Sequence, residues 1–181
     1  MAAKLRNVRD LVNKPEEPDF KLKIEPTSRL VFQGDKIDSG NTAIQVLIEN
    51  ITEERQAYKI KCTSTELFRV RPPIGVLEPK EITTVTVAFS AGKSGVPECF
   101  KHFFAFYHVK AGESKNIKQL WSTTKKPDGV KRMWCIFLKM DGSEFTPPIL
   151  TDQKPADPDK NTKENNNKET KENNNNTAKK E

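Results

Sequence analysis

The amino-acid sequence predicts an all-β domain built as an antiparallel β-sandwich. Three observations lead to this fold class. Apolar and polar residues alternate with a period of two from Phe20 onward, turn residues recur between the alternating runs, and no persuasive helical pattern separates those runs. Consecutive strands without intervening helices pair in antiparallel sheets, and a sandwich is favoured over a barrel.

An N-terminal extension, residues 1–19, precedes the alternating region. Its apolar residues have helical spacing and predict one short amphipathic helix within residues 1–13, which Pro15 and Pro18 then end. A helix of this length is marginal on its own, so we expect it either to dock on the domain or to order with a partner.

Eight strands are predicted within a domain that spans residues 20–142. In chain order they are 20–25, 29–33, 42–50, 56–63, 67–71, 82–90, 101–110 and 131–140. The fifth strand ends at Pro72 and Pro73, because proline has no N–H to donate to a sheet ladder. Residues 143–181 form a polar tail, and from Thr151 onward it has no aromatic residue and no aliphatic residue larger than alanine, so we expect it to be disordered.

Alternation also predicts which side chains point into the sandwich. The inward sets are Ile44, Val46 and Ile48; Tyr58, Ile60 and Cys62; and Val85, Val87 and Phe89. Lys59, Lys61 and Thr63 then share an outer stripe. The last strand is apolar on both faces, so two inward sets stay open, Met133, Cys135 and Phe137 or Trp134, Ile136 and Leu138.

Strand 101–110 is also apolar on both faces. One face carries Phe103, Ala105, Tyr107 and Val109 and forms an acceptable core face, while the other carries His102, Phe104, Phe106 and His108. On this assignment Phe104 and Phe106 are either covered by a loop or the N-terminal segment, or they are exposed as part of a site for a partner.

Composition and motifs argue against several functions. The polar tail from Thr151 has seven Lys and seven Asp or Glu, so the net charge of +6 belongs to residues 1–150, and this mild excess does not predict nucleic-acid binding. The three cysteines lack metal-ligand spacing, and His102 and His108 lie about 20 Å apart along one strand, too far to share a metal ion. No phosphate-binding loop or catalytic motif is present, so we expect no cofactor and no enzyme activity.

No segment has the length and apolar character of a signal peptide or a membrane span. We therefore expect a cytoplasmic protein with reduced thiols and without direct membrane insertion.

Three segments resemble the major sperm protein (MSP) domain, the family that contains nematode sperm cytoskeletal proteins and the membrane-bound VAP adaptors. They are LKIEPTSRLVF (22–32), VLIENITEERQAYKIKCTSTELFRVRPPIGVLEP (46–79) and LWSTTKKPDGVKRMWCIFLKM (120–140). The family pattern of a lysine and two threonines followed by V-R-P-N-x-G corresponds to Lys61, Cys62, Thr63 and residues 70–75. The resemblance implies an immunoglobulin-like seven-stranded sandwich, in which Pro26 is the kink that lets the first strand serve both sheets.

The resemblance also implies a groove for acidic peptides of the FFAT type. Its residues would be Lys61, Thr63 and Arg71, facing His102 and Phe104, and the predicted partner-binding set is completed by Lys59 and Phe106. Cys62 replaces the second threonine of the family pattern, while His102 and Phe104 replace a lysine and a methionine. The loss of a fixed cation and a hydroxyl is expected to weaken acidic-peptide binding by about 1–3 kcal/mol.

A soluble, basic, single MSP domain with an added N-terminal segment and a charged, Asn-rich tail resembles the nematode MSP-domain proteins that accompany sperm filaments, of which the MSP fiber proteins are the known kind. This resemblance implies a non-enzymatic cytoskeletal accessory protein of the sperm pseudopod, which binds major sperm protein or other MSP-domain proteins and modulates filament assembly. The alternatives are a soluble VAP-like adaptor that binds acidic FFAT-type motifs, and a filament-forming subunit.

Overall fold

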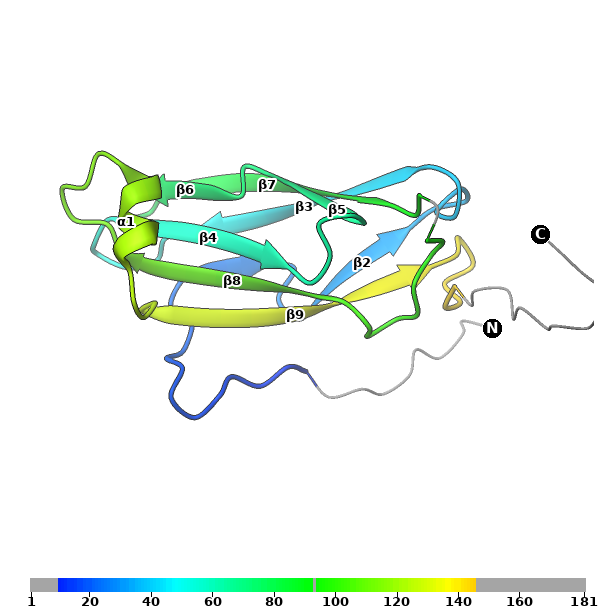
Figure 1. Cartoon of the computed structure of the whole chain (residues 1–181), viewed down its shortest axis with the longest axis horizontal. Coiled ribbons are helices and arrows are strands. Elements are labelled where there is room, and N and C mark those ends of the chain that lie inside the picture. Colours follow the sequence, from blue (N-terminus) through cyan, green and yellow to red (C-terminus); the bar gives the residue numbers. More distant parts are fainter. Residues whose placement is uncertain (1–9, 93, 146–181) are drawn as a thin grey trace, which may run out of the picture. The chain divides into compact units, whose positions relative to one another are not determined.

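The computed structural model describes residues 10–92 and 94–145, which form two β-sheets with a core between them (Figure 1). The four-stranded sheet has the spatial order β1 (Lys23–Glu25), β3 (Asn41–Glu49), β7 (Ile82–Ser90) and β5 (Phe68–Arg71). The five-stranded sheet has the order β2 (Arg29–Gln33), β9 (Gly129–Leu138), β8 (Phe103–Lys110), β4 (Gln56–Cys62) and β6 (Ile74–Leu77). The predicted all-β sandwich is confirmed.

All eight predicted strands are present, and their ends differ from the prediction by at most three residues. Two features differ from it. β6 was not predicted, so the described residues contain nine strands, compared with eight from the sequence pattern and seven implied by the family resemblance. The pairing of β2 with β9 is parallel, whereas every other strand pair is antiparallel.

Prolines mark two of the places where the chain changes sheets. β1 and β2 flank Pro26 and belong to different sheets, as the family resemblance implied. β5 and β6 flank Pro72 and Pro73 and also belong to different sheets. Because proline cannot donate to a ladder, neither strand can continue its pairing through it. The two prolines after β5 therefore end one strand and let the chain cross to the other sheet.

The core between the sheets is rich in phenylalanine. Phe89 and Phe137 lie 4.7 Å apart between ring centroids, and Phe32 lies 5.7 and 5.6 Å from them. Five of the predicted inward residues of β3 and β7 are fully buried: Val46, Ile48, Val85, Val87 and Phe89. The predicted inward residues Ile44 of β3 and Cys62 of β4 are half-buried. For β9 the first of the two open sets is correct: Met133, Cys135 and Phe137 are each 0% exposed.

The predicted orientation of β8 is wrong. Phe104 and Phe106 are 0% and 1% exposed and belong to the core between the sheets, whereas Phe103 and Tyr107 lie half-buried on the outer face. Both faces of β8 are apolar, so alternation could not decide between them.

A short helix, α1 (Ile117–Thr123), covers part of the outer face of the five-stranded sheet. Its Ile117, Leu120 and Trp121 pack on a second apolar cluster that contains Ala57 and Val109. Asn116 caps the helix by accepting a hydrogen bond from the N–H of Gln119. The sequence did not predict α1, because seven residues are too few for a helical period to be recognised.

The chain before β1 forms no helix and no named strand, and it turns at Lys14–Glu17, where Glu17 donates its N–H to Lys14 O (2.9 Å). Residues 10–13, the described part of the predicted helix, are not helical, and the rest of that prediction lies outside the described residues. We call residues 10–19 the N-terminal arm. At the other end, Phe145 packs against the core and donates its N–H to Phe137 O (2.9 Å), so the ordered domain continues past residue 142. The predicted disordered tail was 143–181, and of it residues 146–181 lie outside the described residues.

Candidate protein-binding site

A cleft opens between the unpaired edges of β4 and β5. β6 pairs with β4 only over Gln56–Lys59, so the end of β4 has no neighbour on that side, and β5 is the edge strand of the other sheet. The cleft has a volume of about 470 Å³. It is lined by Ile60, Lys61, Cys62, Thr65, Phe68, Arg69, Val70 and Pro73.

The cleft combines an apolar floor with basic side chains at its rim. Phe68 is buried and Val70 half-buried at the floor, whereas Lys61 and Arg69 are exposed. Arg69 donates to two backbone carbonyls, those of Thr65 and Phe68, and Lys61 lies 5.8 Å from the centre of the Tyr107 ring. None of the ion pairs found within residues 10–92 and 94–145 involves either cation. Both charges are therefore available to an acidic partner.

The edges of the cleft also present backbone groups. In an antiparallel ladder, peptide groups turn alternately toward one neighbouring strand and away from it. Ile60 donates its N–H to Pro73 O (2.8 Å), on the side away from β8, and the same alternation turns the peptide groups of Cys62 to that open side. On β5 the same alternation turns the peptide groups of Val70 away from β7, toward the cleft. An extended segment in the cleft could hydrogen-bond to either edge.

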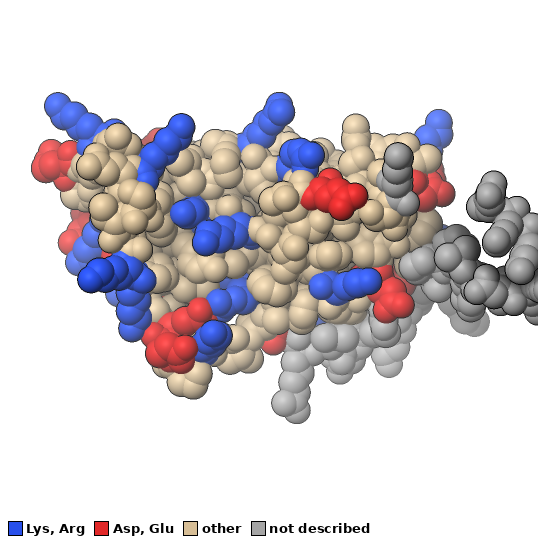
Figure 2. All heavy atoms as spheres, viewed as in Figure 1, with Lys and Arg blue, Asp and Glu red and all other residues tan. Residues whose placement is uncertain are grey.

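A smaller hollow lies beside the cleft on the outer face of the five-stranded sheet. Its volume is about 190 Å³, and Lys61 lines it as well as the cleft. The Nζ atom of Lys59 lies 5.4 Å from the centre of the Trp121 ring, and Lys125 from the segment after α1 adds a third cation. Figure 2 shows basic side chains spread over the surface above β4 and β8.

Several predicted site residues come together here. Lys59, Lys61 and Thr63 follow one outer stripe, as predicted. The Oγ1 atom of Thr63 lies 2.9 Å from Nδ1 of His102, at the end of that stripe. Burial lowers the pKa of His102, so its ring is neutral at neutral pH and does not replace the fixed lysine charge of the family pattern.

Arg71, also predicted as a site residue, does not line the cleft. It lies on the outer face of the four-stranded sheet, in a separate hollow of about 410 Å³ together with Arg69 and Thr86. Arg69, which was not among the predicted site residues, lines both that hollow and the cleft. No sequence pattern could distinguish the two arginines, because they alternate onto the same face of β5.

Phe104 and Phe106 are removed from the site. Both were predicted as partner-binding residues, but their side chains are buried between the sheets and offer a partner no surface. Phe104 instead lies edge-on to Phe68, with 5.0 Å between ring centroids, and so supports the floor of the cleft from below.

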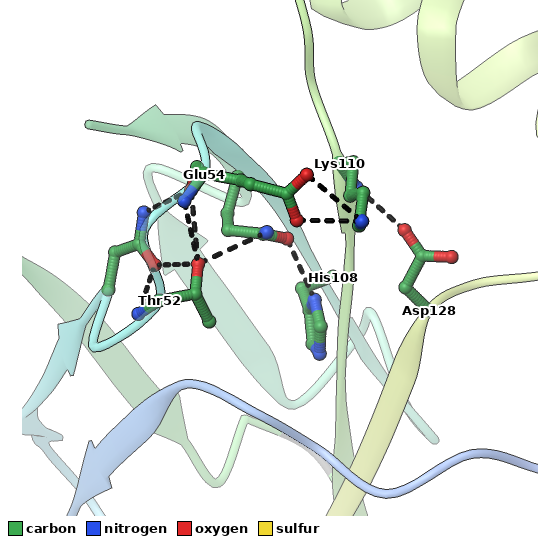
Figure 3. Close-up of polar contacts among 7 residues, drawn as sticks. Thr52, Glu54, His108, Lys110 and Asp128 are labelled. Atoms are coloured by element: carbon green, nitrogen blue, oxygen red, sulfur yellow. Dashed lines mark hydrogen bonds and ion pairs between the residues drawn. The ribbon is translucent and has the colours of Figure 1, made fainter. Parts of the chain in front are cut away.

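A buried hydrogen-bond network around His108 connects β8 to neighbouring segments of the chain (Figure 3). His108 is 1% exposed; its Nε2 accepts a hydrogen bond from Lys21 N–H (3.1 Å), and its Nδ1 lies 3.0 Å from Gln56 Oε1. Gln56 in turn donates to Thr52, whose hydroxyl donates to Asn50 (2.7 Å). Burial lowers the pKa of His108 to about 4, and both of its ring nitrogens are occupied by protein groups.

Within residues 10–92 and 94–145, no cluster of three or more His, Cys, Asp or Glu side chains is arranged to hold a metal ion. The single helix of this described part is too short to cross a lipid bilayer. The Cys62 thiol in the cleft donates to Ser64 O (3.3 Å), and burial raises its pKa, which keeps it protonated at neutral pH.

Comparisons with known proteins agree with this architecture. The chain is 30% identical over 148 residues to the uncharacterized protein R05D3.5 of Caenorhabditis elegans, covering 71% of this chain and 82% of that protein. It is 32% identical over 117 residues to major sperm protein 10/36/56/76 of the same nematode, covering 65% of this chain and 79% of the relative. It is 28% identical over 119 residues to rat vesicle-associated membrane protein-associated protein A, covering 64% of this chain but only 47% of the rat protein.

The solved structure of WR4, an MSP family member of C. elegans, superimposes with a TM-score of 0.53 at 17% identity, covering 65% of this chain and 97% of WR4. The family model for the MSP (Major sperm protein) domain matches residues 21–127. This match covers more than half of the chain and includes the segment from β1 to α1. The chain therefore belongs to the MSP-domain family, with relatives among both the major sperm proteins and the VAP proteins.

Proposed function

We propose that this chain is a non-enzymatic binding protein whose β4–β5 cleft receives an extended acidic segment of a partner protein. The observation that carries this proposal is the combination of Lys61 and Arg69, each without an ion-pair partner in the described residues, with an apolar floor and open strand edges. An acidic segment would gain charge-assisted contacts at the rim, backbone hydrogen bonds at the edge and apolar contacts at the floor. The VAP resemblance supports the same chemistry, that of FFAT-type motifs.

The test is a titration of the full-length protein with an acidic FFAT-type peptide that has an aromatic residue among its carboxylates. The variants Lys61→Glu and Arg69→Glu should each weaken binding by about 1–3 kcal/mol, because each places a carboxylate against the acidic peptide. Lys36→Glu, an equal charge change at an exposed loop position, should leave the affinity nearly unchanged. Arg71→Glu should have a smaller effect than Arg69→Glu. Equal effects of all four variants would show that only net charge matters and would contradict a cleft.

A second candidate concerns the identity of the partner. The 32% identity to a major sperm protein over 117 residues favours an accessory role in the MSP cytoskeleton, in which the chain binds MSP subunits or filaments and modulates their assembly. Sedimentation of the purified chain with polymerised major sperm protein tests this role. Co-sedimentation that persists in Lys61→Glu would separate filament binding from the cleft, and a chain that stays in the supernatant at every filament concentration would refute the accessory role.

A further inference from the structure

The outer face of the four-stranded sheet carries two arginines on its edge strand, β5. Residues that are directly opposite on neighbouring strands share a face, so Arg69 stands beside Ala88 of β7, and Arg71 stands beside Thr86. Both neighbours are short and uncharged. The single helix of residues 10–92 and 94–145, α1, packs on the other sheet and does not cover this face. Both arginines are therefore exposed, and they line one hollow of about 410 Å³.

The guanidinium groups of these arginines have N–H groups available for a ligand. Arg69 donates from Nη1 to two backbone carbonyls, and its other N–H groups have no partner among the described residues. Within the same part of the chain, the Arg71 side chain forms no hydrogen bond and no ion pair. Glu66, the acidic residue in the lining of the hollow, accepts a hydrogen bond from Ser94 (3.2 Å) and pairs with neither arginine.

The size and polarity of the hollow favour a ligand with several acceptor oxygens. Asn41 of β3 and Thr86 and Ser90 of β7 line it and add neutral hydrogen-bond donors. The Cα atoms of Arg69 and Arg71 are about 7 Å apart along the strand. A carboxylate satisfies the fork of one arginine, whereas a phosphorylated side chain has more acceptor oxygens and about twice the charge, so it can bond to both.

The hollow and the β4–β5 cleft meet at β5, because Arg69 lines both of them. An extended segment that pairs with the open edge of β5 continues the four-stranded sheet, and its side chains point alternately to the two faces of that sheet. A residue opposite Val70 then points toward the apolar floor of the cleft. The residues on either side of it lie opposite Arg69 and Arg71 on the outer face.

We propose that the Arg69–Arg71 hollow binds a phosphorylated serine or threonine of the partner segment, directly beside the apolar residue that enters the cleft. The phosphate lies opposite one arginine and diagonal to the other, within reach of both long side chains. Thr86 adds a hydroxyl donor from β7. This inference rests on the proposed function, because the segment in the cleft brings the phosphate to the hollow. Phosphorylation of the partner then controls its affinity.

Titration of the full-length protein with matched acidic peptides is the test. The peptides differ only in the residue that is serine, glutamate or phosphoserine directly beside the aromatic residue, and one further peptide has phosphoserine two positions from it. Phosphoserine beside the aromatic residue should bind at least about tenfold more tightly than serine, and glutamate should give a smaller gain. Phosphoserine two positions away should gain less than about threefold, because strand alternation turns it from the arginines.

Variants of the protein locate the phosphate. Arg71→Ala should lower the ratio of the phosphopeptide and serine-peptide affinities to less than about threefold, and Arg71→Lys should keep only part of the ratio, because lysine has no fork. Lys118→Ala, which removes an exposed charge on α1 beside the other sheet, is the matched control and should keep the full ratio. Circular dichroism checks the fold, and Arg71→Lys replaces Arg71→Ala if the latter is unfolded.

The possible outcomes separate this inference from the proposed function. If phosphorylation adds nothing while the serine peptide still binds and depends on Lys61, the phosphate site is refuted and the cleft is supported. If no peptide binds, both fail. A gain that survives in Arg71→Ala but is lost in Lys59→Ala places the phosphate in the hollow beside Trp121 and refutes the Arg69–Arg71 site. Equal losses in Arg71→Ala and Lys118→Ala would assign the gain to net charge and refute it as well.

Discussion

Individual residues in this protein are constrained by the groups that they face. Gly75 in β6 lies against the ring of Tyr58, and a Cβ atom at this position would come within 2.6 Å of the ring carbons. His108 lies between the two segments that it holds, with Lys21 on one ring nitrogen and Gln56 on the other. Each of these residues stabilises contacts between segments that are far apart in the sequence.

Burial of His108 predicts that the domain loses stability in mild acid. The pKa of His108 is lowered from 6.5 to about 4 in the folded state, so between these values the unfolded chain binds a proton that the native chain does not. Stability therefore falls as the pH falls from about 6.5 to 4, by about 3 kcal/mol in total. Urea unfolding at a series of pH values measures this slope.

The His108→Gln variant should be less stable at pH 7, because a buried hydrogen-bond network is changed, but its stability should depend much less on pH in the same window. His102→Gln provides the control and should keep most of the slope, because His102 is only half-buried. A steep slope that survives in His108→Gln would show that carboxylates, and not this histidine, cause the acid sensitivity.

At the scale of elements, β8 is the strand that alternation orients wrongly. Both of its faces carry aromatic residues, so the sequence of β8 does not determine which face points inward. The contacts with the opposite sheet determine it. Phe104 packs on Phe68 of β5, whereas Phe103 packs on Trp134 of the neighbouring β9, on the outer face. The orientation of the strand is therefore decided by a contact across the sandwich.

This orientation predicts unequal costs for two adjacent truncations. Phe104→Ala should destabilise the domain by about 3–5 kcal/mol, because it leaves a cavity between the sheets. Phe103→Ala should cost less than about half of that, since its ring is half-buried and water can replace it. Thermal or urea unfolding of both variants measures the difference, and equal costs would contradict the orientation described here.

At the scale of the whole molecule, charge and shape act together on the same surface. The chain carries a net charge of +6, and Lys59, Lys61 and Arg69 belong to the face that contains the cleft and the neighbouring hollow. Under the proposed function, we expect long-range attraction to guide an acidic segment toward this face and the cleft to determine how it binds.

Acidic-peptide binding should consequently weaken with salt. Raising the ionic strength from about 0.05 to 0.5 M should lower the affinity by about an order of magnitude, because exposed charges are screened over less than 10 Å. Calorimetric titration at several salt concentrations measures this dependence, with Lys61→Glu expected to show a shallower slope. An affinity independent of salt would mean that apolar contacts alone hold the peptide.

The sequence by itself determined the sandwich, eight of its strands and the inward residues of β3 and β7, because a period of two and the prolines that end strands are local properties of the chain. It determined the family through the resemblance of three segments to the MSP domain. It also predicted the stripe of Lys59, Lys61 and Thr63. Only the tertiary structure decided the facing of β8, the sheet crossing into β6, the choice of Arg69 over Arg71 and the docking of the arm through Glu17 and Arg132. These features depend on contacts between residues that are distant in the chain, which alternation along one strand does not encode.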